Sequence, residues 1–334
     1  MESSNPAVFK VGQSKVKQWL RCKYAAHLKH VEKLEPKRTK RPFAFGKIVH
    51  HAIELAANGD DWRQALDVDL NTREMFSAEV EMYGDILTDI DYIMTDYFEH
   101  WSQKGDLQFV KINGKKSEHA FEIELEDGLV FTGIFDGVAK WRTNRVLAEH
   151  KSFKQRPSED FRWLNVQSSV YIKAMDILGW KPVDGTLWNY IKSKPPAIPK
   201  LLQSGEPSQA KIDSLPSVFK AWCKENGFKA RNYPTLLKSL AENRAEYFFR
   251  VFTPVSRNVV DNVYEGFVDA AIDMRDNLGK KKHKTIDQHC KWCEFASICR
   301  AELTGSDADF IKEREFKVSE SNAHEDEIAA KLDE

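Results

Sequence analysis

The chain has 334 residues, of which 42% are hydrophobic and 30% are charged, a composition typical of a folded protein with one large domain or two smaller ones. It contains no apolar run of about 18 residues that could span a membrane, and its first residues lack the apolar core of a signal peptide. We therefore expect a cytoplasmic protein, in which cysteines are better suited to metal binding than to disulfide formation.

The net charge of −1 hides an uneven distribution of charged residues. Acidic residues exceed basic ones between Glu302 and Glu334, so the rest of the chain is mildly basic. Two basic clusters stand out: Lys37, Arg38, Lys40, Arg41 and Lys47, and then Lys280, Lys281, Lys282 and Lys284. Such clusters can neutralise phosphates, although taken alone they are more simply interpreted as solvated surface.

The first third of the chain predicts helices. Ser14 is a candidate N-cap for a helix over residues 15–30, and a second helix should begin near Phe45. Residues 61–101 predict two more helices, with Val80 and Tyr83 among the apolar positions at helical spacing. We therefore assign residues 1–117 to an N-terminal helical region.

The pattern changes at Glu118, where polar and apolar residues begin to alternate as in a strand. The pair Asp127-Gly128 predicts a hairpin turn, and strands are expected over 129–141, 145–152, 185–192 and 246–253, with helices over 165–178 and 258–278. These elements predict an α/β fold with a central mixed β-sheet flanked by helices, spanning residues 118–278. Residues 194–243, rich in proline and with a helix near 215–226, form an insertion in this core.

The remaining segments differ in character. Residues 279–302 carry three cysteines, and residues 303–334 form an acidic tail that we expect to be disordered or loosely helical.

Two acidic residues and a lysine lie on neighbouring predicted strands. Asp136 lies late in the strand over 129–141, Glu149 lies in the next strand, and Lys151 shares a strand face with Glu149 because it follows two residues later. Both carboxylates could bind one Mg²⁺ or Mn²⁺ ion, with the His150 carbonyl as a further ligand, and the ammonium could orient a water for phosphodiester hydrolysis. The alternative is a pair of cross-strand charges on the surface.

Two helical patterns flank this group. Gly46, His50 and Glu54 are spaced four residues apart, and so are Gln167 and Tyr171, which places each set on one helical face. The neighbouring His51 is the alternative to His50 as a ligand.

The ordered set of Gly46 to His50, Gly133 to Asp136, Glu149 to Lys151, and Gln167 to Tyr171 resembles the RecB-type branch of the PD-(D/E)XK nuclease superfamily. The resemblance implies a restriction-endonuclease-like nuclease core. It implies a metal bound by His50, Asp136 and Glu149, and Lys151 as the catalytic lysine. Gln167 and Tyr171 would position the DNA backbone and the active site.

Four cysteines form a second candidate site. Cys290, Cys293 and Cys299 have C-x2-C-x5-C spacing, and Cys22 lies far away in the first predicted helix. Four thiolates could hold a [4Fe-4S] cluster or a zinc ion, whereas Cys223 is expected in the core. The arrangement is similar to AddB-like subunits and to CRISPR-associated and phage RecB-like exonucleases. That resemblance implies an iron–sulfur cluster that fastens the first helix to the C-terminal end of the nuclease domain.

These features predict a Mg²⁺- or Mn²⁺-dependent deoxyribonuclease, and the resemblance implies an exonuclease acting on DNA ends or single strands in recombination, repair or phage DNA processing. The sequence has no Gly-x4-Gly-Lys-Ser/Thr motif for ATP binding, so a helicase, annealase or recombinase would be a separate partner. One alternative is a non-catalytic iron–sulfur subunit that binds DNA within a larger complex, and another is an RNA-processing nuclease.

Overall fold

The structure is a computed structural model that describes residues 8–38, 40–68, 70, 84–102, 104–126, 128–163, 165–319 and 323–333. It is a mixed α/β fold with sheets flanked by helices, which confirms the predicted fold class. Val80 and Tyr83, which were expected on a helix, lie outside these ranges. Within them, no helix has both the length and the apolar character that a membrane crossing requires.

A five-stranded sheet forms the centre of the molecule, in the order β3-β6-β7-β8-β9. Its strands are β3 (Leu107–Phe109), β6 (Gly137–Trp141), β7 (Asn144–Phe153), β8 (Gly185–Lys192) and β9 (Phe248–Pro254). Strands β7 and β8 are parallel and the other pairs are antiparallel. A parallel pair requires a crossover, and this one contains α6 (Glu159–Trp163) and α7 (Val166–Ile177).

A second, three-stranded sheet has the order β1-β5-β4. It consists of β1 (Phe9–Val11), β4 (His119–Glu126) and β5 (Leu129–Phe135). The single strand predicted over 129–141 is therefore wrong, because β5 ends at Phe135 and β6 begins at Gly137 in the other sheet. Asp136 lies in the bend between the two sheets, where its carbonyl accepts a 3.2 Å hydrogen bond from the amide of Glu118.

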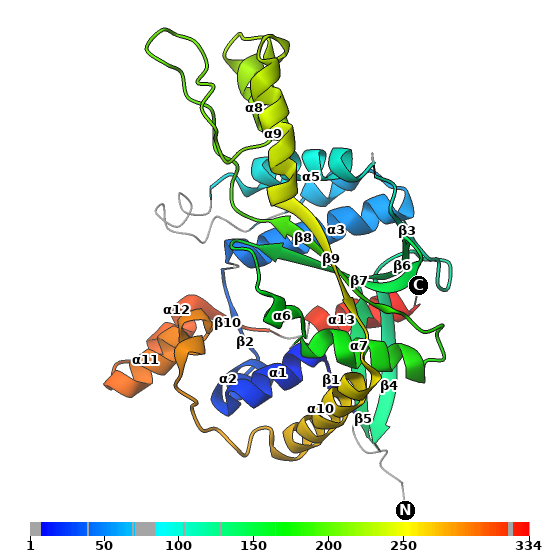
Figure 1. The fold of residues 1–334 in the computed structure, drawn as a ribbon. Coiled ribbons are helices and arrows are strands. Elements are labelled where there is room, and N and C mark those ends of the chain that lie inside the picture. Colours follow the sequence, from blue (N-terminus) through cyan, green and yellow to red (C-terminus); the bar gives the residue numbers. More distant parts are fainter. Residues whose placement is uncertain are drawn as a thin grey trace, which may run out of the picture.

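Two sets of helices cover the sheets (Figure 1). Helices α3 (Arg41–Asn58) and α5 (Ile86–Ser102), with the short η1 (Trp62–Leu66), pack in one hydrophobic cluster with β8 and β9. Helices α7 and α10 (Arg257–Asn277) pack with β4 and β5 in another. Helix α3 begins earlier than predicted because Pro42 occupies its first turn, a position that proline favours.

The helix predicted over 15–30 is two helices, α1 (Gln13–Arg21) and α2 (Lys23–His30), separated by Cys22 in an extended conformation. Gly12, and not Ser14, occupies the N-cap position of α1. The break is stabilised from a distance, because the amide of Tyr24 donates a 3.2 Å hydrogen bond to the carbonyl of His283. This contact pairs one of the amides that a new helix start leaves without an intrahelical partner.

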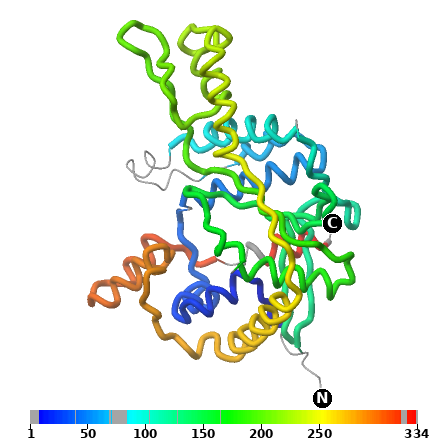
Figure 2. Tube along the Cα trace, in the orientation of Figure 1, coloured from blue at the N-terminus to red at the C-terminus, as the bar shows by residue number. Residues whose placement is uncertain are grey.

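Residues 194–243 form most of a projection that extends away from the sheets (Figure 2). It contains α8 (Pro216–Glu225), η3 (Ala230–Asn232) and α9 (Pro234–Tyr247), which continues directly into β9. Phe219, Trp222, Leu236 and Leu240 give the projection its own buried cluster, and Cys223 belongs to this cluster.

The chain after residue 278 returns to the N-terminal part of the fold. It forms η4 (Gln288–Trp292), α11 (Ala296–Thr304), α12 (Ala308–Glu315), β10 (Phe316–Val318) and α13 (Ala323–Asp333). Strand β10 pairs with β2 (Leu34–Pro36), and α13 packs against β4. Of the two alternatives expected for the acidic tail, the described residues are largely helical, in α12 and α13, and Phe316 and Ile328, only 4% and 2% exposed, anchor this otherwise acidic segment.

Candidate active site

Strand β7 presents Glu149 and Lys151 on the same face, as their spacing predicted. The Lys151 Nζ atom lies 2.8 Å from Glu149 Oε2 and 3.2 Å from the Oε1 atom of Gln167. Gln167 reaches this point from the first turn of α7, whose N-cap Asn165 accepts a 3.2 Å hydrogen bond from the Ser168 amide. The structure therefore brings three of the predicted site residues into direct contact.

Asp136 and His50 meet at the middle of β7. Asp136 Oδ2 accepts a 2.6 Å hydrogen bond from the backbone amide of His150. His50 projects from α3, with Nδ1 3.7 Å from Asp136 Oδ1 and Nε2 2.9 Å from the His150 carbonyl oxygen. The alternative ligand, His51, is instead exposed and lies 3.2 Å from Glu54. The geometry favours His50 over His51.

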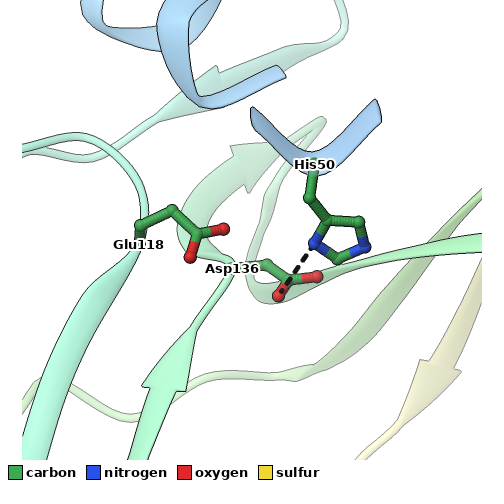
Figure 3. Close-up of side chains that lie close together, drawn as sticks. All are labelled: His50, Glu118 and Asp136. Carbon is green, nitrogen blue, oxygen red and sulfur yellow. Dashed lines mark ion pairs between the residues drawn. The ribbon is translucent and has the colours of Figure 1, made fainter. Parts of the chain in front are cut away.

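Glu118 is a site residue that our sequence analysis missed. One ligand atom each from His50, Glu118 and Asp136 lie within 4.8 Å of one another, and the carboxylate of Glu118 points towards Asp136 (Figure 3). The signal that could have identified it is the predicted hairpin. A turn at residues 127–128 places Glu118 beside Gly137, and a bulge between Glu124 and Glu126 shifts the register so that His119 pairs with Phe135.

The described carboxylates are close enough to alter each other's ionisation. Burial raises the pKa of Glu149 to about 7, with Lys151 opposing and Asp136 adding to the rise. Burial also raises the pKa of Glu118 well above its usual range, and Asp136 adds to that rise. Burial alone would raise the pKa of Asp136, but His50, Lys151 and His150 hold it below its ordinary value. Burial and mutual repulsion therefore both disfavour a state in which all three carboxylates are ionised at once.

The side chains of His150 and Tyr171 are buried and uncharged. Burial lowers the pKa of His150 to about 3, and its Nδ1 lies 2.9 Å from the side-chain nitrogen Nδ2 of Asn189. Burial raises the pKa of Tyr171 above its usual range, with Glu149 and Asp136 adding to the effect. The ring of Tyr171 packs against Phe135, with ring centroids 5.2 Å apart. His150 can therefore offer its carbonyl, but its ring is directed elsewhere.

The donor set suits a hard divalent cation. Carboxylate and carbonyl oxygens are the ligands that Mg²⁺ and Mn²⁺ prefer, and the imidazole of His50 adds a nitrogen donor that is more usual for transition metals. Glu149 Oε1 is fully buried and has no hydrogen-bond partner among the described residues, which is costly unless a cation or water satisfies it. The hydrogen bond of 2.9 Å between His50 Nε2 and the His150 carbonyl leaves Nδ1, 3.7 Å from Asp136 Oδ1, as the imidazole nitrogen that would face the ion. These residues fit such an ion.

Cys22, Cys290, Cys293 and Cys299 all line one hollow of about 1060 Å³. The hollow lies where α1 and α2 meet η4 and α11. Contacts across it include Glu294 Oε1, 2.8 Å from Lys29 Nζ and 3.4 Å from Gln18 Nε2. No three of these sulfur atoms lie within 4.8 Å of one another, whereas thiolates around a tetrahedral zinc would be about 3.8 Å apart. The four cysteines therefore line the same hollow, but their sulfur atoms do not form a close cluster.

The thiols also influence each other electrostatically. Burial raises the pKa of Cys293, and the neighbouring Cys22 and Cys290 add to the rise. Burial likewise raises the pKa of Cys299, although Lys284 opposes it. Thiolates in such a group would be stabilised by a bound metal, which favours the deprotonated form.

Comparisons with known proteins identify one family. The family model described as the PD-(D/E)XK nuclease superfamily matches residues 10–300. No curated protein matches the sequence. A solved structure titled "Crystal structure of SSO0001" is similar with a TM-score of 0.33 and 12% sequence identity, over 91% of this chain and 89% of that one.

Proposed function

The chain belongs to the PD-(D/E)XK nuclease superfamily, and on this premise we propose that it is a Mg²⁺- or Mn²⁺-dependent deoxyribonuclease of the RecB-like branch. The observation that carries the proposal is the convergence of Lys151, Glu149 and Gln167 on one face of β7, beside the contacts that His50 and Asp136 make with the backbone of His150. A surface pair of charges would not bury Glu149 completely.

Each residue has a distinct role in this proposal. His50, Asp136, Glu149 and the His150 carbonyl hold the metal, with Glu118 as an additional oxygen donor. The metal supplies a Lewis acid for the phosphate and lowers the pKa of a bound water. The Lys151 ammonium holds the attacking water and offsets charge on the phosphate. Gln167 keeps Lys151 oriented through its 3.2 Å contact, and the buried ring of Tyr171 supports the face on which the acids lie.

The proposed substrate is DNA, attacked at ends or in single strands. The exonuclease mode comes from the resemblance of the motifs to RecB-like exonucleases, and so does a role in recombination, repair or phage DNA processing. A helicase, annealase or recombinase would act as a separate partner, since the sequence has no ATP-binding motif.

We further propose that Cys22, Cys290, Cys293 and Cys299 hold a [4Fe-4S] cluster with a structural role. The proposal is supported by the spacing of the cysteines, by the resemblance to RecB-like exonucleases, and by the presence of all four cysteines in the lining of one hollow. A metal clasp between residues this far apart in sequence would restrict the unfolded chain and stabilise the contact between α1–α2 and the C-terminal segment.

Replacing Asp136 by Ala tests whether the protein is an enzyme or a DNA-binding subunit. The proposal predicts that the variant loses metal-dependent cleavage of linear DNA and still binds DNA in a mobility-shift assay, because most binding energy comes from phosphate contacts elsewhere. A wild-type protein that binds DNA without metal-dependent cleavage would support the alternative of a non-catalytic subunit. Competition between DNA and RNA of the same sequence tests the RNA alternative.

A further inference from the structure

The last helix of the chain reaches the candidate metal site. Lys331, the only lysine or arginine of α13, places Nζ 2.8 Å from Glu54 Oε1 and 3.8 Å from Glu118 Oε2. Its side chain is 14% exposed, and that of Glu118 is 13% exposed. Glu54 lies one turn after His50 on α3, and Glu118 belongs to the group shown in Figure 3. A residue more than 200 positions away in sequence thus lies between two elements of the site.

Two lysines form ion pairs with the acidic side chains of this region. Lys151 pairs with Glu149 on the side of α7, and Lys331 pairs with Glu54 and Glu118 on the side of α13. Helix α13 is held in place by burial of Ile328, which is 2% exposed, and by an ion pair between Glu325 and Lys15 of α1 at 3.3 Å. The position of Lys331 is therefore set by the packing of the whole helix.

We propose that Lys331 is a built-in counter-cation that sets the metal affinity of the site, and this inference rests on the proposed function. Its ammonium stabilises Glu118 and Glu54 while no metal is bound, competes for Glu118 with an incoming divalent cation, and repels that cation. Both effects weaken metal binding. Helix α13 thereby stabilises the acidic site at low metal concentration. A divalent cation binds only when its concentration is high enough to displace Lys331 from Glu118.

The test is calorimetric titration of the full-length protein with Mn²⁺ in the wild type, Lys331→Met and Lys331→Arg. We expect Lys331→Met to bind Mn²⁺ about tenfold tighter. Substitutions of residues next to metal ligands typically change metal affinity by this much. Lys331→Arg retains the charge and should match the wild type. The matched control is Lys312→Met, which removes a lysine of α12 that pairs at 2.8 Å with Glu32 and lies outside the site. This control should leave Mn²⁺ affinity unchanged.

A second readout separates this role from ordinary stabilisation. The Mn²⁺ concentration giving half-maximal cleavage should fall about tenfold in Lys331→Met, with the rate at saturating Mn²⁺ unchanged, whereas a merely structural loss would lower the saturating rate. Unchanged or weaker Mn²⁺ binding by Lys331→Met would overturn the inference, as would a wild type that binds no Mn²⁺.

If Lys331→Met does not fold, Lys331→Gln gives the same test while keeping a hydrogen-bond donor for Glu54. A wild type that binds Mn²⁺ but cleaves no DNA would refute the proposed function and leave the binding test decisive for Lys331.

Discussion

The backbone amide of His150 donates a 2.6 Å hydrogen bond to Oδ2 of Asp136. This bond fastens the bend between the two sheets to the strand that carries Glu149 and Lys151. The other carboxylate oxygen of Asp136 remains directed at His50, 3.7 Å away. One side chain therefore holds the backbone of β7 with one oxygen and, in the proposed function, faces the metal site with the other.

Gly133 allows the rings beneath the site to approach β5. A Cβ atom at this position would lie 2.7 Å from the ring of Phe121 and 3.2 Å from the hydroxyl of Tyr171. We expect Gly133→Ala to lower the free energy of unfolding by about 1–3 kcal/mol, the usual cost of overpacking a core, as measured by urea denaturation. Gly46→Ala is the matched control, because a Cβ there would only make an ordinary 3.8 Å contact with Ser152 Oγ. Equal stability of Gly133→Ala and the wild type would contradict this explanation.

The raised pKa of Glu149 predicts pH-dependent metal binding. Burial raises this pKa from 4.5 to about 7, so the carboxyl of the metal-free protein holds a proton below about pH 7 that a metal must displace. We expect Mn²⁺ affinity to rise with pH up to about 7, by up to roughly tenfold per pH unit for one released proton, and then to lose this dependence. Calorimetry in two buffers of different ionisation enthalpy measures the proton release. Glu149→Gln should release about one proton fewer, and an unchanged proton release would contradict the assignment.

The same shift affects stability. Because the folded pKa of Glu149 lies above its ordinary value, the stability this group contributes is fully present below about pH 4.5 and is lost as the pH rises towards 7. Added Mn²⁺ should therefore raise the melting temperature more at pH 8 than at pH 6. A larger increase at pH 6 would contradict this sign.

The proposed [4Fe-4S] cluster predicts a defined iron content. Protein purified without oxygen should contain about four iron atoms per chain, the content of a [4Fe-4S] cluster, and Cys290→Ser should lose most of this iron. Cys223→Ser is the matched control, because Cys223 is buried in the separate cluster of α8 and α9 and should not affect iron content. Zinc without iron in the wild type, or equal iron loss in both variants, would contradict the proposal.

Much of the fold follows from local sequence patterns. Strand β8 spans Gly185–Lys192 as predicted, and α7 and α10 agree with prediction to within one residue at each end. These elements have strong apolar patterns and clear boundaries, such as the N-cap Asn165 of α7. The contact between Lys151 and Gln167 was likewise foreseeable, because both lie in elements that were correctly assigned.

The features that could not be predicted depend on contacts between distant segments. The helix break at Cys22 is accompanied by a bond from Tyr24 to His283, and no proline or glycine marks it in the sequence. The bend at Asp136 is accompanied by a hydrogen bond from the amide of His150. Helix α13 carries an acidic sequence that suggested disorder, but Ile328 and the ion pair of Lys331 with Glu54 anchor it. In each case a tertiary contact outweighs the local pattern.

The measurement that tests the central claim most directly is cleavage of end-labelled linear DNA by the wild type and by Lys151→Ala, each with and without Mn²⁺. We expect the wild type to release label only when Mn²⁺ is present, and we expect Lys151→Ala to lose at least about a hundredfold in rate, the lower end of what positioned proton-transfer and charge-stabilising groups contribute. Cleavage by Lys151→Ala at the wild-type rate, or no metal-dependent cleavage by the wild type, would contradict the account.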